Sequence, residues 1–385
     1  MRLYNSLTKK LETFTPLDKT NVKMYVCGIT PYDTTHLGHA FTYVFFDSLI
    51  RYLTYKDFSV TYTQNVTDIN DRDNDILKRA KELGIAWQYL ANFWTDKFLD
   101  DMHALNWTMP DHFLWASAHI SGMISLINKL LEKDVAYRKN SGVYLDTKKV
   151  KDFGKLSGFA HGKMLTIARE FDEDIDNPDK RNPLDITLWR PTLKKQPTHI
   201  PSFPSPFGEG RPGWHLECSA MAICSLGEQI DIHGGGMDLI YPHHESEIAQ
   251  SEMGTNKVPF AKYWLHTELV SYKGQKMSKS LGNLVMVSDL LQKYSANAIR
   301  YTLLSHHYRT RWEFNESELK EAEAKVIEIR KSLNFKSSGN INSTIQQFNN
   351  FLDDDMNTPK ALEIMTNAEN NGDVKQMAQV LGFKF

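Results

Sequence analysis

The chain has 385 residues, more than a single hydrophobic core usually holds, so two or three packed units are expected. With 41% hydrophobic residues, 24% charged residues and a net charge of -2, its composition excludes a disordered chain, a fibrous repeat and a globally basic nucleic-acid binder. A local basic face would not show in these sums, so they leave RNA binding open. The three cysteines are too few for a disulfide framework, which fits a reducing compartment.

No run of residues reaches the roughly 18 consecutive apolar positions that predict a membrane span. The first residues also lack the apolar run and the small-residue cleavage site of a secretory signal. We therefore expect a cytoplasmic protein that has no membrane partner.

The first predicted elements are a strand, a helix and a second strand. Residues 22–28 are an apolar run that ends in Gly, residues 39–55 carry apolar side chains at helical spacing, and residues 58–70 alternate like a β-branched strand. This βαβ unit implies a parallel sheet that binds ligands at the carboxyl ends of its strands. Cys27 and Thr67 lie at two such ends.

The middle of the chain shows helical periodicity over residues 73–106 and 116–134, and short strand candidates follow at 135–146. Residues 150–213 are rich in Lys, Asp and Pro and have weak periodicity, which predicts an irregular insertion that carries loops. A second α/β segment follows, with elements predicted at 213–227 (helix), 229–233 (strand), 234–236 (glycine run), 242–254 (helix) and 260–270 (strand).

Helices dominate from Ser288 onward, where two long segments carry apolar stripes and charge pairs at i,i+4 spacing. The polar residues 336–350 predict a linker, and the last 35 residues can form two short helices. The predicted fold class is therefore α/β: a Rossmann-like parallel sheet that binds a nucleotide, split by an insertion and followed by a helical C-terminal region.

Residues of the second α/β segment have the spacing of metal ligands. Cys218 lies 25 residues before His243, and His243 lies four residues before Glu247, which stacks the last two on one helix face. Adding Cys27 gives two sulfur donors, one nitrogen and one oxygen, a set that suits zinc better than magnesium or calcium. The spacing leaves two alternatives open: buried cysteines beside helix-capping histidines, and His244 as the ligand in place of His243.

Two short motifs point to a nucleotide. His36, Gly38 and His39 form HLGH between the first strand and its helix, where nitrogen donors can grip a phosphate near a helix N-terminus. KMSKS supplies Lys276 and Lys279 as point charges for phosphates. Alone, HLGH can be a chance match and KMSKS can be a solvated basic loop. The occurrence of both motifs, one in each half of the chain, favours nucleotide binding.

These motifs occur together with MYVCG, NVTDIND, KRNPLDITLW, SPFGEGRPGWHLECSAM and DIHGGGMDLIYPHHESEIAQSE. In this order, over almost the whole chain, they resemble the class I aminoacyl-tRNA synthetases, and among them the cysteinyl-tRNA synthetase family. The resemblance implies a ligase that uses ATP to activate L-cysteine as cysteinyl-adenylate and transfers cysteine to the acceptor end of tRNA(Cys). We expect a monomer.

The resemblance also assigns roles to residues of this chain. One zinc ion per subunit is held by Cys27, Cys218, His243 and Glu247 and binds the substrate thiolate directly. The cysteine pocket is lined by Thr67, Trp214 and His233. ATP, accompanied by Mg²⁺, is bound by His36, Gly38, His39 and Lys279. Positioning and charge stabilisation during attack on the α-phosphorus come from His36, His39, Lys276 and Lys279.

A metal that binds the thiolate explains how cysteine is told from serine. Ordinary contacts separate substrates of such similar shape by only about 1–3 kcal/mol. A soft cation does better, because a neutral hydroxyl is a poor ligand that does not ionise readily at neutral pH.

The expected division of the chain follows the resemblance: the first half of the catalytic domain with HLGH (1–120), an inserted connective region (121–205), the second half with the zinc ligands and KMSKS (206–287), a helical stem-contact region (288–335), and a linker with a short helical tail (336–385). We expect the anticodon-binding domain to be absent.

Two other functions remain open. The short chain and the segment GITPYDTTHLGHA are similar to the related ligase of mycothiol biosynthesis, which joins cysteine to the amine of glucosaminyl-inositol. KRNPLDITLW, the histidine in DIHGGG and the acidic segment REFDEDIDNPD favour the synthetase instead. A paralogue that binds zinc and nucleotide without catalysis is disfavoured because both nucleotide motifs are intact.

Overall fold

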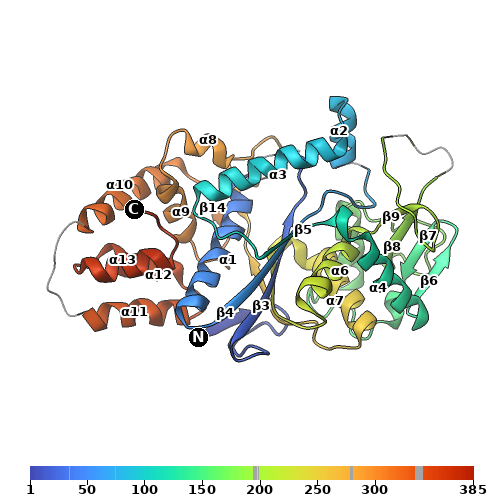
Figure 1. Cartoon of the computed structure of the whole chain (residues 1–385), viewed down its shortest axis with the longest axis horizontal. Coiled ribbons are helices and arrows are strands. Elements are labelled where there is room, and N and C mark those ends of the chain that lie inside the picture. The colour runs from blue at the N-terminus through green and yellow to red at the C-terminus, as the bar shows by residue number, and fades with distance from the viewer. Residues whose placement is uncertain (34, 74, 194–196, 198, 278–280, 334–340) are drawn as a thin grey trace.

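The structure, a computed structural model, describes residues 1–385 except 34, 74, 194–196, 198, 278–280 and 334–340 (Figure 1). At its centre is a five-stranded sheet in which every neighbouring pair is parallel. The strands lie in the spatial order β11 (Ala261–Thr267), β10 (Ile230–Gly236), β3 (Asn21–Ile29), β4 (Ser59–Val66) and β5 (His112–Trp115). The strand order therefore reverses between β3 and β10, and ligands of open α/β sheets bind at such a switch point.

Strand β3 is apolar because both of its faces are covered, as is usual for the central strand of a parallel sheet. Its pairing with β4 shifts register between Val26 and Ile29. At that shift a Cβ on Gly28 would lie 1.6 Å from the Asn65 carbonyl oxygen, so only glycine fits. The Gly28 N–H donates to Asn65 Oδ1 at 2.9 Å, which fixes the strand end beside Cys27.

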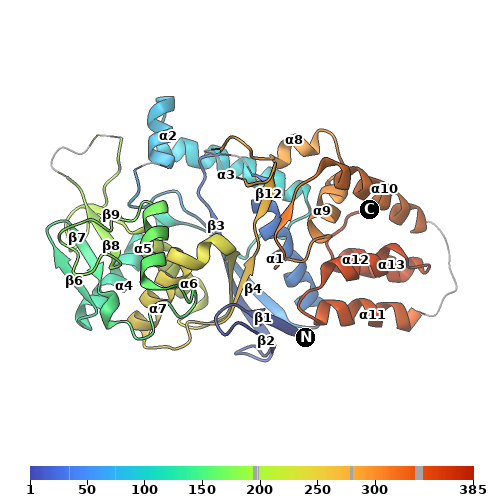
Figure 2. The same cartoon turned by 180° about the vertical axis from the view of Figure 1, so that it is seen from behind.

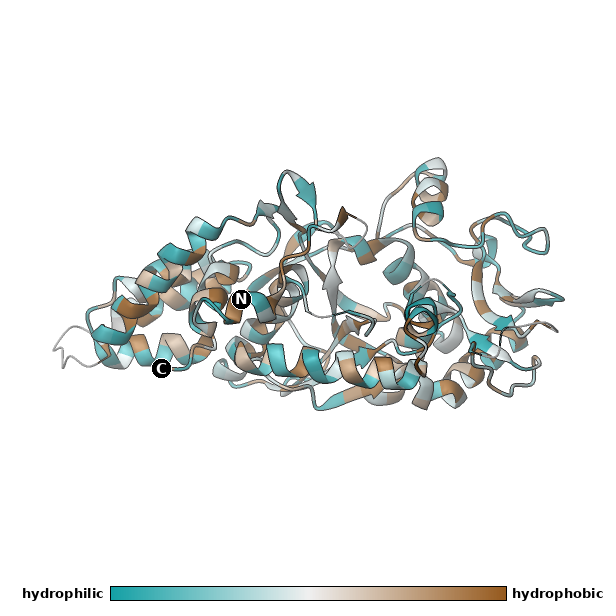
Figure 3. Ribbon diagram, turned by 90° about the horizontal axis from the view of Figure 1, so that it is seen from above, coloured by the Kyte–Doolittle hydropathy of each residue, from teal (hydrophilic) through white to brown (hydrophobic). Residues whose placement is uncertain are grey.

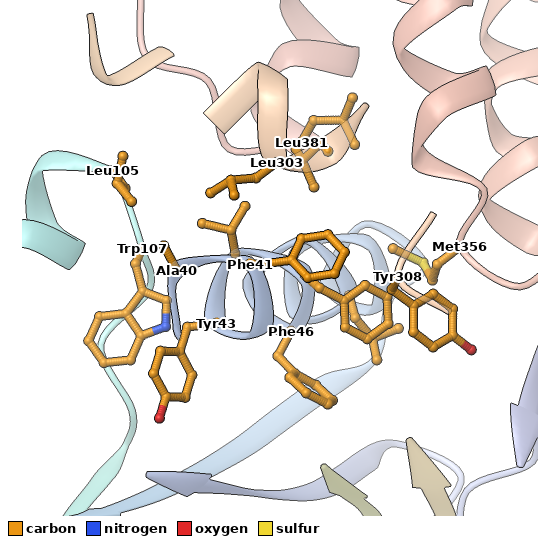
Figure 4. Close-up of a cluster of buried hydrophobic side chains, with 14 of the residues drawn as sticks. Ala40, Phe41, Tyr43, Phe46, Leu105, Trp107, Leu303, Tyr308, Met356 and Leu381 are labelled. Carbon is orange, nitrogen blue, oxygen red and sulfur yellow. The ribbon is translucent and has the colours of Figure 1, made fainter. Parts of the chain in front are cut away.

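Helix α1 (Leu37–Tyr55) is buried along most of its 19 residues because it lies between the sheet and the C-terminal helices. Figure 4 shows Tyr43 and Phe46 on the side of α1 that faces the strands, with Leu303 and Leu381 across its other side. A Cβ on Gly234 of β10 would lie 2.1 Å from the Phe46 ring. The glycine run thus belongs to the end of strand β10, and Gly234 allows α1 to approach it closely.

Residues beyond β11 form a small sheet and a helical bundle that packs on α1 (Figure 1). Its elements are β12 (Val270–Tyr272), β13 (Gln275–Lys276), α8 (Val287–Leu291), α9 (Ala296–Leu304), β14 (Trp312–Glu313), α10 (Glu316–Ser332), α11 (Ile341–Asp353), α12 (Thr358–Thr366) and α13 (Asn371–Val380). Hydrophobic and hydrophilic residues share each of the longer helices (Figure 3).

The linker prediction for residues 336–350 was wrong over its second half, where α11 begins at Ile341. This helix packs against α12 and α13, and its Phe348 and Leu352 are fully buried. Tertiary burial of these two side chains outweighs the polar composition of the segment.

The insertion over residues 150–213, predicted to be irregular, carries regular elements as well as loops. The segment contains helix α5 (His161–Glu170) and strands β8 (Ile186–Pro191) and β9 (Gly210–Pro212). They complete an antiparallel sheet with β6 (Ala136–Lys139) and β7 (Gly142–Leu145) in the order β6-β7-β8-β9. The short strands pair across long sequence separations, so local periodicity does not reveal them.

The remaining described elements frame the sheet (Figure 2). They are the hairpin β1 (Arg2–Asn5) and β2 (Lys10–Thr13), and helices α2 (Ile76–Leu83), α3 (Trp87–Ala104), α4 (Ile120–Glu132), α6 (Trp214–Leu226) and α7 (Glu245–Thr255). In the part of the chain that the structure describes, no helix has the length and apolar content needed to cross a membrane. The α/β fold class is confirmed, whereas the exact domain boundaries stay a prediction.

A buried ion pair connects the C-terminal bundle to α1. Arg300 of α9 pairs with Asp47 of α1, and neither side chain is exposed by more than 1%. The guanidinium also donates to the carbonyls of Leu381 at 2.6 Å and Leu105 at 2.8 Å. The charge is therefore compensated by one carboxylate and two carbonyls from three other segments.

We expect Arg300→Met to lower the free energy of unfolding by about 3 kcal/mol, because Asp47 keeps Arg51 but loses its fully buried partner, and the carbonyls of Leu105 and Leu381 lose their donor. Lys325→Met is the matched control, since Lys325 pairs with Glu328 on the surface, where both side chains are about half exposed. That change should shift stability by no more than about 0.5 kcal/mol. Urea unfolding followed by circular dichroism measures both, and equal midpoints for the two variants would contradict the prediction.

Candidate active site

A cavity of about 430 Å³ opens at the carboxyl ends of β3 and β10, at the switch point of the sheet. Nine of the residues predicted for the site line it: Cys27, His36, Gly38, His39, Thr67, Trp214, Cys218, His243 and Lys276. Lys279 lies outside the described residues. Glu247 and His233 lie directly behind the wall, and both are fully buried.

The structure brings together the four residues whose spacing predicted a metal site. One donor atom from each of Cys27, Cys218, His243 and Glu247 can be chosen so that all lie within 4.8 Å of one another. The two sulfurs are 3.9 Å apart, Cys27 Sγ is 3.5 Å from Glu247 Oε1, and His243 Nε2 is 3.1 Å from the same oxygen. The donors come from β3, from α6, from the turn that leads into α7 and from α7 itself, so the complete fold is needed to assemble them.

The prediction that a helix opens at Pro242 is confirmed: the backbone is helical from Pro242 onward, with a π-helical first turn. Tyr241 keeps an extended backbone, as residues before proline usually do, and regular α7 begins at Glu245. His243 lies in the π-helical turn before it. The side chains of His243 and Glu247 nevertheless meet on one face, as their spacing predicted.

A second set of donors shares two members with the first: Cys27, His233, His244 and Glu247. His233 Nε2 is 2.9 Å from Glu247 Oε2, and His244 Nε2 is 3.3 Å from Cys27 Sγ. Neither histidine lines the cavity, whereas Cys27, Cys218 and His243 do. Only the first set therefore faces space that a substrate can enter, and the role of His233 in cysteine binding stays a prediction.

Burial controls the protonation of the cluster. It raises the pKa of the Cys27 thiol, and the neighbouring Cys218 and Glu247 raise it further. It lowers the pKa of His243, so that this imidazole is neutral and keeps a lone pair for a metal. A cation is thus needed to compensate the charge before Cys27 becomes a thiolate.

Contacts behind His243 were not predicted from the sequence. His243 Nδ1 lies 2.9 Å from His215 Nδ1, and His215 Nε2 lies 3.0 Å from Glu173 Oε1. His215 precedes Cys218 by three residues on α6, a spacing that would have indicated a shared helix face. Glu173 lies in the irregular acidic segment, where no periodicity pointed to it.

The cavity walls also position the predicted cysteine-pocket residues. The Trp214 ring stacks on the His243 ring with centroids 4.6 Å apart, and the Arg72 guanidinium lies 3.7 Å above the indole. Thr67 Oγ1 accepts a hydrogen bond from Asn65 Nδ2 at 3.0 Å. These contacts place an aromatic wall and a hydroxyl beside the candidate metal site.

The nucleotide motif lies at the start of α1. His36 is the N-cap residue, and its Nδ1 accepts from the His39 N–H at 3.3 Å. The two rings stack with centroids 3.7 Å apart. Lys276 of the second motif reaches the same cavity and pairs with Asp238 at 3.1 Å. The helix N-terminus, two imidazoles and an ammonium thus converge where an anion can bind.

A family model described as "tRNA synthetases class I (C) catalytic domain" matches residues 13–324. The chain belongs to this family. As a class I tRNA synthetase it is a ligase, and its relatives include a cysteine–tRNA ligase of Legionella pneumophila (strain Paris), 43% identical over 100% of this chain and 85% of the relative. A cysteine–tRNA ligase of Dehalococcoides mccartyi is 45% identical over 94% of this chain and 78% of the relative.

Among solved structures, this class I synthetase is similar to methionyl-tRNA synthetase of Mycobacterium tuberculosis in complex with methionyl-adenylate. The TM-score is 0.64 at 16% identity, over 94% of this chain and 88% of that one. This likeness confirms the fold. The family model confirms the family resemblance predicted from the motifs. Enzymes of this class bind an amino acid, ATP and tRNA.

The partly buried His39 of HLGH makes stability depend on pH. Burial lowers the pKa of His39 from 6.5 to about 4, partly offset by Asp238. Between these values the unfolded chain binds more protons than the folded one, so the free energy of unfolding falls as the pH falls below 6.5. We expect this single residue to contribute about 2 kcal/mol to the loss of stability between pH 7 and pH 5.

Urea unfolding of His39→Gln at the two pH values should therefore show a loss smaller by that amount than in the parent. His161→Gln, at an exposed position at the start of α5, is the control and should keep the parental pH dependence. A parental pH dependence in His39→Gln would show that His39 is not held neutral by burial.

Proposed function

We propose that this synthetase is a cysteine–tRNA ligase, which forms cysteinyl-adenylate from L-cysteine and ATP and transfers cysteine to tRNA(Cys). The observation that carries the proposal is the cluster of Cys27, Cys218, His243 and Glu247 at the base of the nucleotide cavity. Two relatives that are 43% and 45% identical over nearly the whole chain are named cysteine–tRNA ligases. We also propose that the protein acts as a monomer in the cytoplasm.

The donor set of the cluster fits zinc. Two thiolates, one imidazole and one carboxylate are common zinc ligands, and the soft sulfur donors disfavour magnesium and calcium. Zinc held by Cys27, Cys218, His243 and Glu247 would supply an electrophilic position that accepts the thiolate of cysteine but not the neutral hydroxyl of serine. Trp214 covers His243 and limits the access of water, and Thr67 offers a hydroxyl to the polar end of the amino acid.

Adenylate formation requires the cysteine carboxylate to attack the α-phosphorus of ATP in line, with pyrophosphate leaving. His36 and His39 have pKa values lowered by burial, so each offers a neutral imidazole N–H to the phosphates. Lys276 offers an ammonium after releasing Asp238, and we propose that Lys279 and Mg²⁺ join it on the triphosphate. The chain contributes mainly positioning and charge stabilisation.

Glucosaminyl-inositol remains the second candidate acceptor because of the segment GITPYDTTHLGHA. The two relatives favour tRNA, and no contact in the described residues favours the amine. The same relatives disfavour a non-catalytic paralogue.

We expect ATP–pyrophosphate exchange to depend on cysteine, with serine inert, and total tRNA to be charged with cysteine. The reason is that the cavity combines a thiolate-selective cluster with a phosphate-binding helix terminus. Radiolabelled exchange and acid-precipitable aminoacylation measure the two steps. Coupling of cysteine to glucosaminyl-inositol without tRNA charging would select the other acceptor, and absence of exchange with cysteine would refute both enzymes.

Replacing Cys27 or Cys218 by Ser should lower the zinc content of the purified protein from one ion per chain to less than about half, with a parallel loss of exchange activity. Cys224→Ser is the matched control, because this cysteine is exposed and lies outside the cluster. Metal content is measured by inductively coupled plasma mass spectrometry. Full activity in a metal-free variant would exclude the ligand assignment.

A further inference from the structure

We propose that Glu173 is a positioning residue that, through His215, holds the metal ligand His243 in the orientation in which its Nε2 binds a cation. The inference rests on the proposed function only in taking His243 as a ligand. It assigns a role in the metal site to the insertion, whose acidic segment supplies Glu173.

The three side chains form a continuous row of contacts. Glu173 Oε1 lies 3.0 Å from His215 Nε2, His215 Nδ1 lies 2.9 Å from His243 Nδ1, and His243 Nε2 points to the cluster, 3.1 Å from Glu247 Oε1. His215 and His243 are no more than 3% exposed, so water does not replace the contact between them, whereas Glu173 is 16% exposed. The hydrogen bond between the two histidines therefore needs one donor and one acceptor from the rings themselves.

The direction of the row is set by the carboxylate. Burial opposes the ionisation of Glu173, but His215 and then Arg72 outweigh it and lower its pKa to about 2. An ionised carboxylate can only accept, so His215 Nε2 must carry a hydrogen. When His243 binds a cation through Nε2, its Nδ1 carries the hydrogen and donates to His215 Nδ1, so the hydrogen of His215 lies on Nε2 and is donated to Glu173. The lone pair of His243 is left on Nε2, which faces the cluster.

Without a cation, Glu247 Oε1 is an acceptor 3.1 Å from His243 Nε2 and favours a hydrogen on that nitrogen. The row therefore takes the direction described above when a cation binds His243 Nε2. Such outer contacts orient metal-bound histidines and raise their basicity.

The second pair of histidines lacks this constraint. His244 Nδ1 lies 2.7 Å from His266 Nε2, and His266 Nδ1 lies 2.8 Å from Ser6 Oγ. A hydroxyl both donates and accepts, so Ser6 permits either direction. This difference agrees with the placement of His243, and not His244, on the cavity wall.

Arg72 keeps the carboxylate in place. Its guanidinium donates to Glu173 at 2.9 Å and stacks on Trp214, whose ring stacks in turn on His243. Glu173 thus contacts neither the nucleotide cavity nor the metal cluster. It is held by Arg72, which also stacks on Trp214, the residue whose ring covers His243. A glutamine at this position keeps the shape but can donate as well as accept.

The test is the zinc affinity of Glu173→Gln, measured at pH 7 by competition with a chromophoric chelator. We expect binding to weaken about 10- to 100-fold, as is usual for loss of an outer contact to a metal ligand. Glu170→Gln, at an exposed position on α5, is the matched control and should bind zinc like the parent. In a His215→Ala background Glu173→Gln should cause no further loss, because its effect passes through His215.

A second measurement does not depend on that background folding. In the zinc-loaded parent, nitrogen chemical shifts of the His215 ring should show a hydrogen on Nε2, and Glu173→Gln should move the Nε2 resonance because an amide oxygen replaces the carboxylate. Parental zinc affinity in Glu173→Gln, an equal loss in the His215→Ala background, or a hydrogen on Nδ1 of His215 in the zinc-loaded parent would overturn the inference. Failure of cysteine-dependent exchange in a parent with the expected tautomer would refute only the proposed function.

Discussion

The parallel pairing of β3 with β10 is the constraint on which the site depends. It joins Val26, one residue before Cys27, to Gly234, one residue after His233, across more than 200 positions of sequence. Without this pairing, the sulfur donor of the first half and the ligands that follow β10 would have no common edge. The close approach of Phe46 to Gly234 then places α1, and with it HLGH, over the same end of the sheet. The metal cluster and the phosphate site are therefore two consequences of one strand pair.

Burying the ionised donors of the cluster at this edge costs free energy when no cation is bound. Two thiols, three imidazoles and a carboxylate lie within a few contacts of one another, and burial shifts the pKa of Cys27 and His243 toward the neutral forms. A divalent ion reverses this preference for the thiols because it supplies the missing positive charge. The protein thus pre-arranges donors whose charged state depends on the metal. The lowered pKa of Glu173 keeps its carboxylate ionised at neutral pH, so this carboxylate can only accept a hydrogen bond in its contact with His215.

The sequence revealed those parts of the site that obey short-range rules. The spacing of His243 and Glu247, the strand-to-helix position of HLGH and the βαβ unit all follow from helix and strand geometry, and the structure confirms each placement. The antiparallel sheet of the insertion and Glu173 escaped because their partners are distant in sequence. Helix α11 escaped because two buried side chains, Phe348 and Leu352, outweigh a polar composition. The family resemblance supplied the role of Cys27, which its sequence position alone left open.

The same strand pair has a consequence for synthesis of the chain on the ribosome. About 200 residues separate the end of β3 from the end of β10, and translation at roughly 5–20 residues per second delays the second strand by on the order of 10–40 s. During that interval one edge of a largely apolar strand has no neighbour, which exposes the nascent chain to aggregation. The order of synthesis, and not only the final geometry, therefore bears on how much active enzyme a cell obtains.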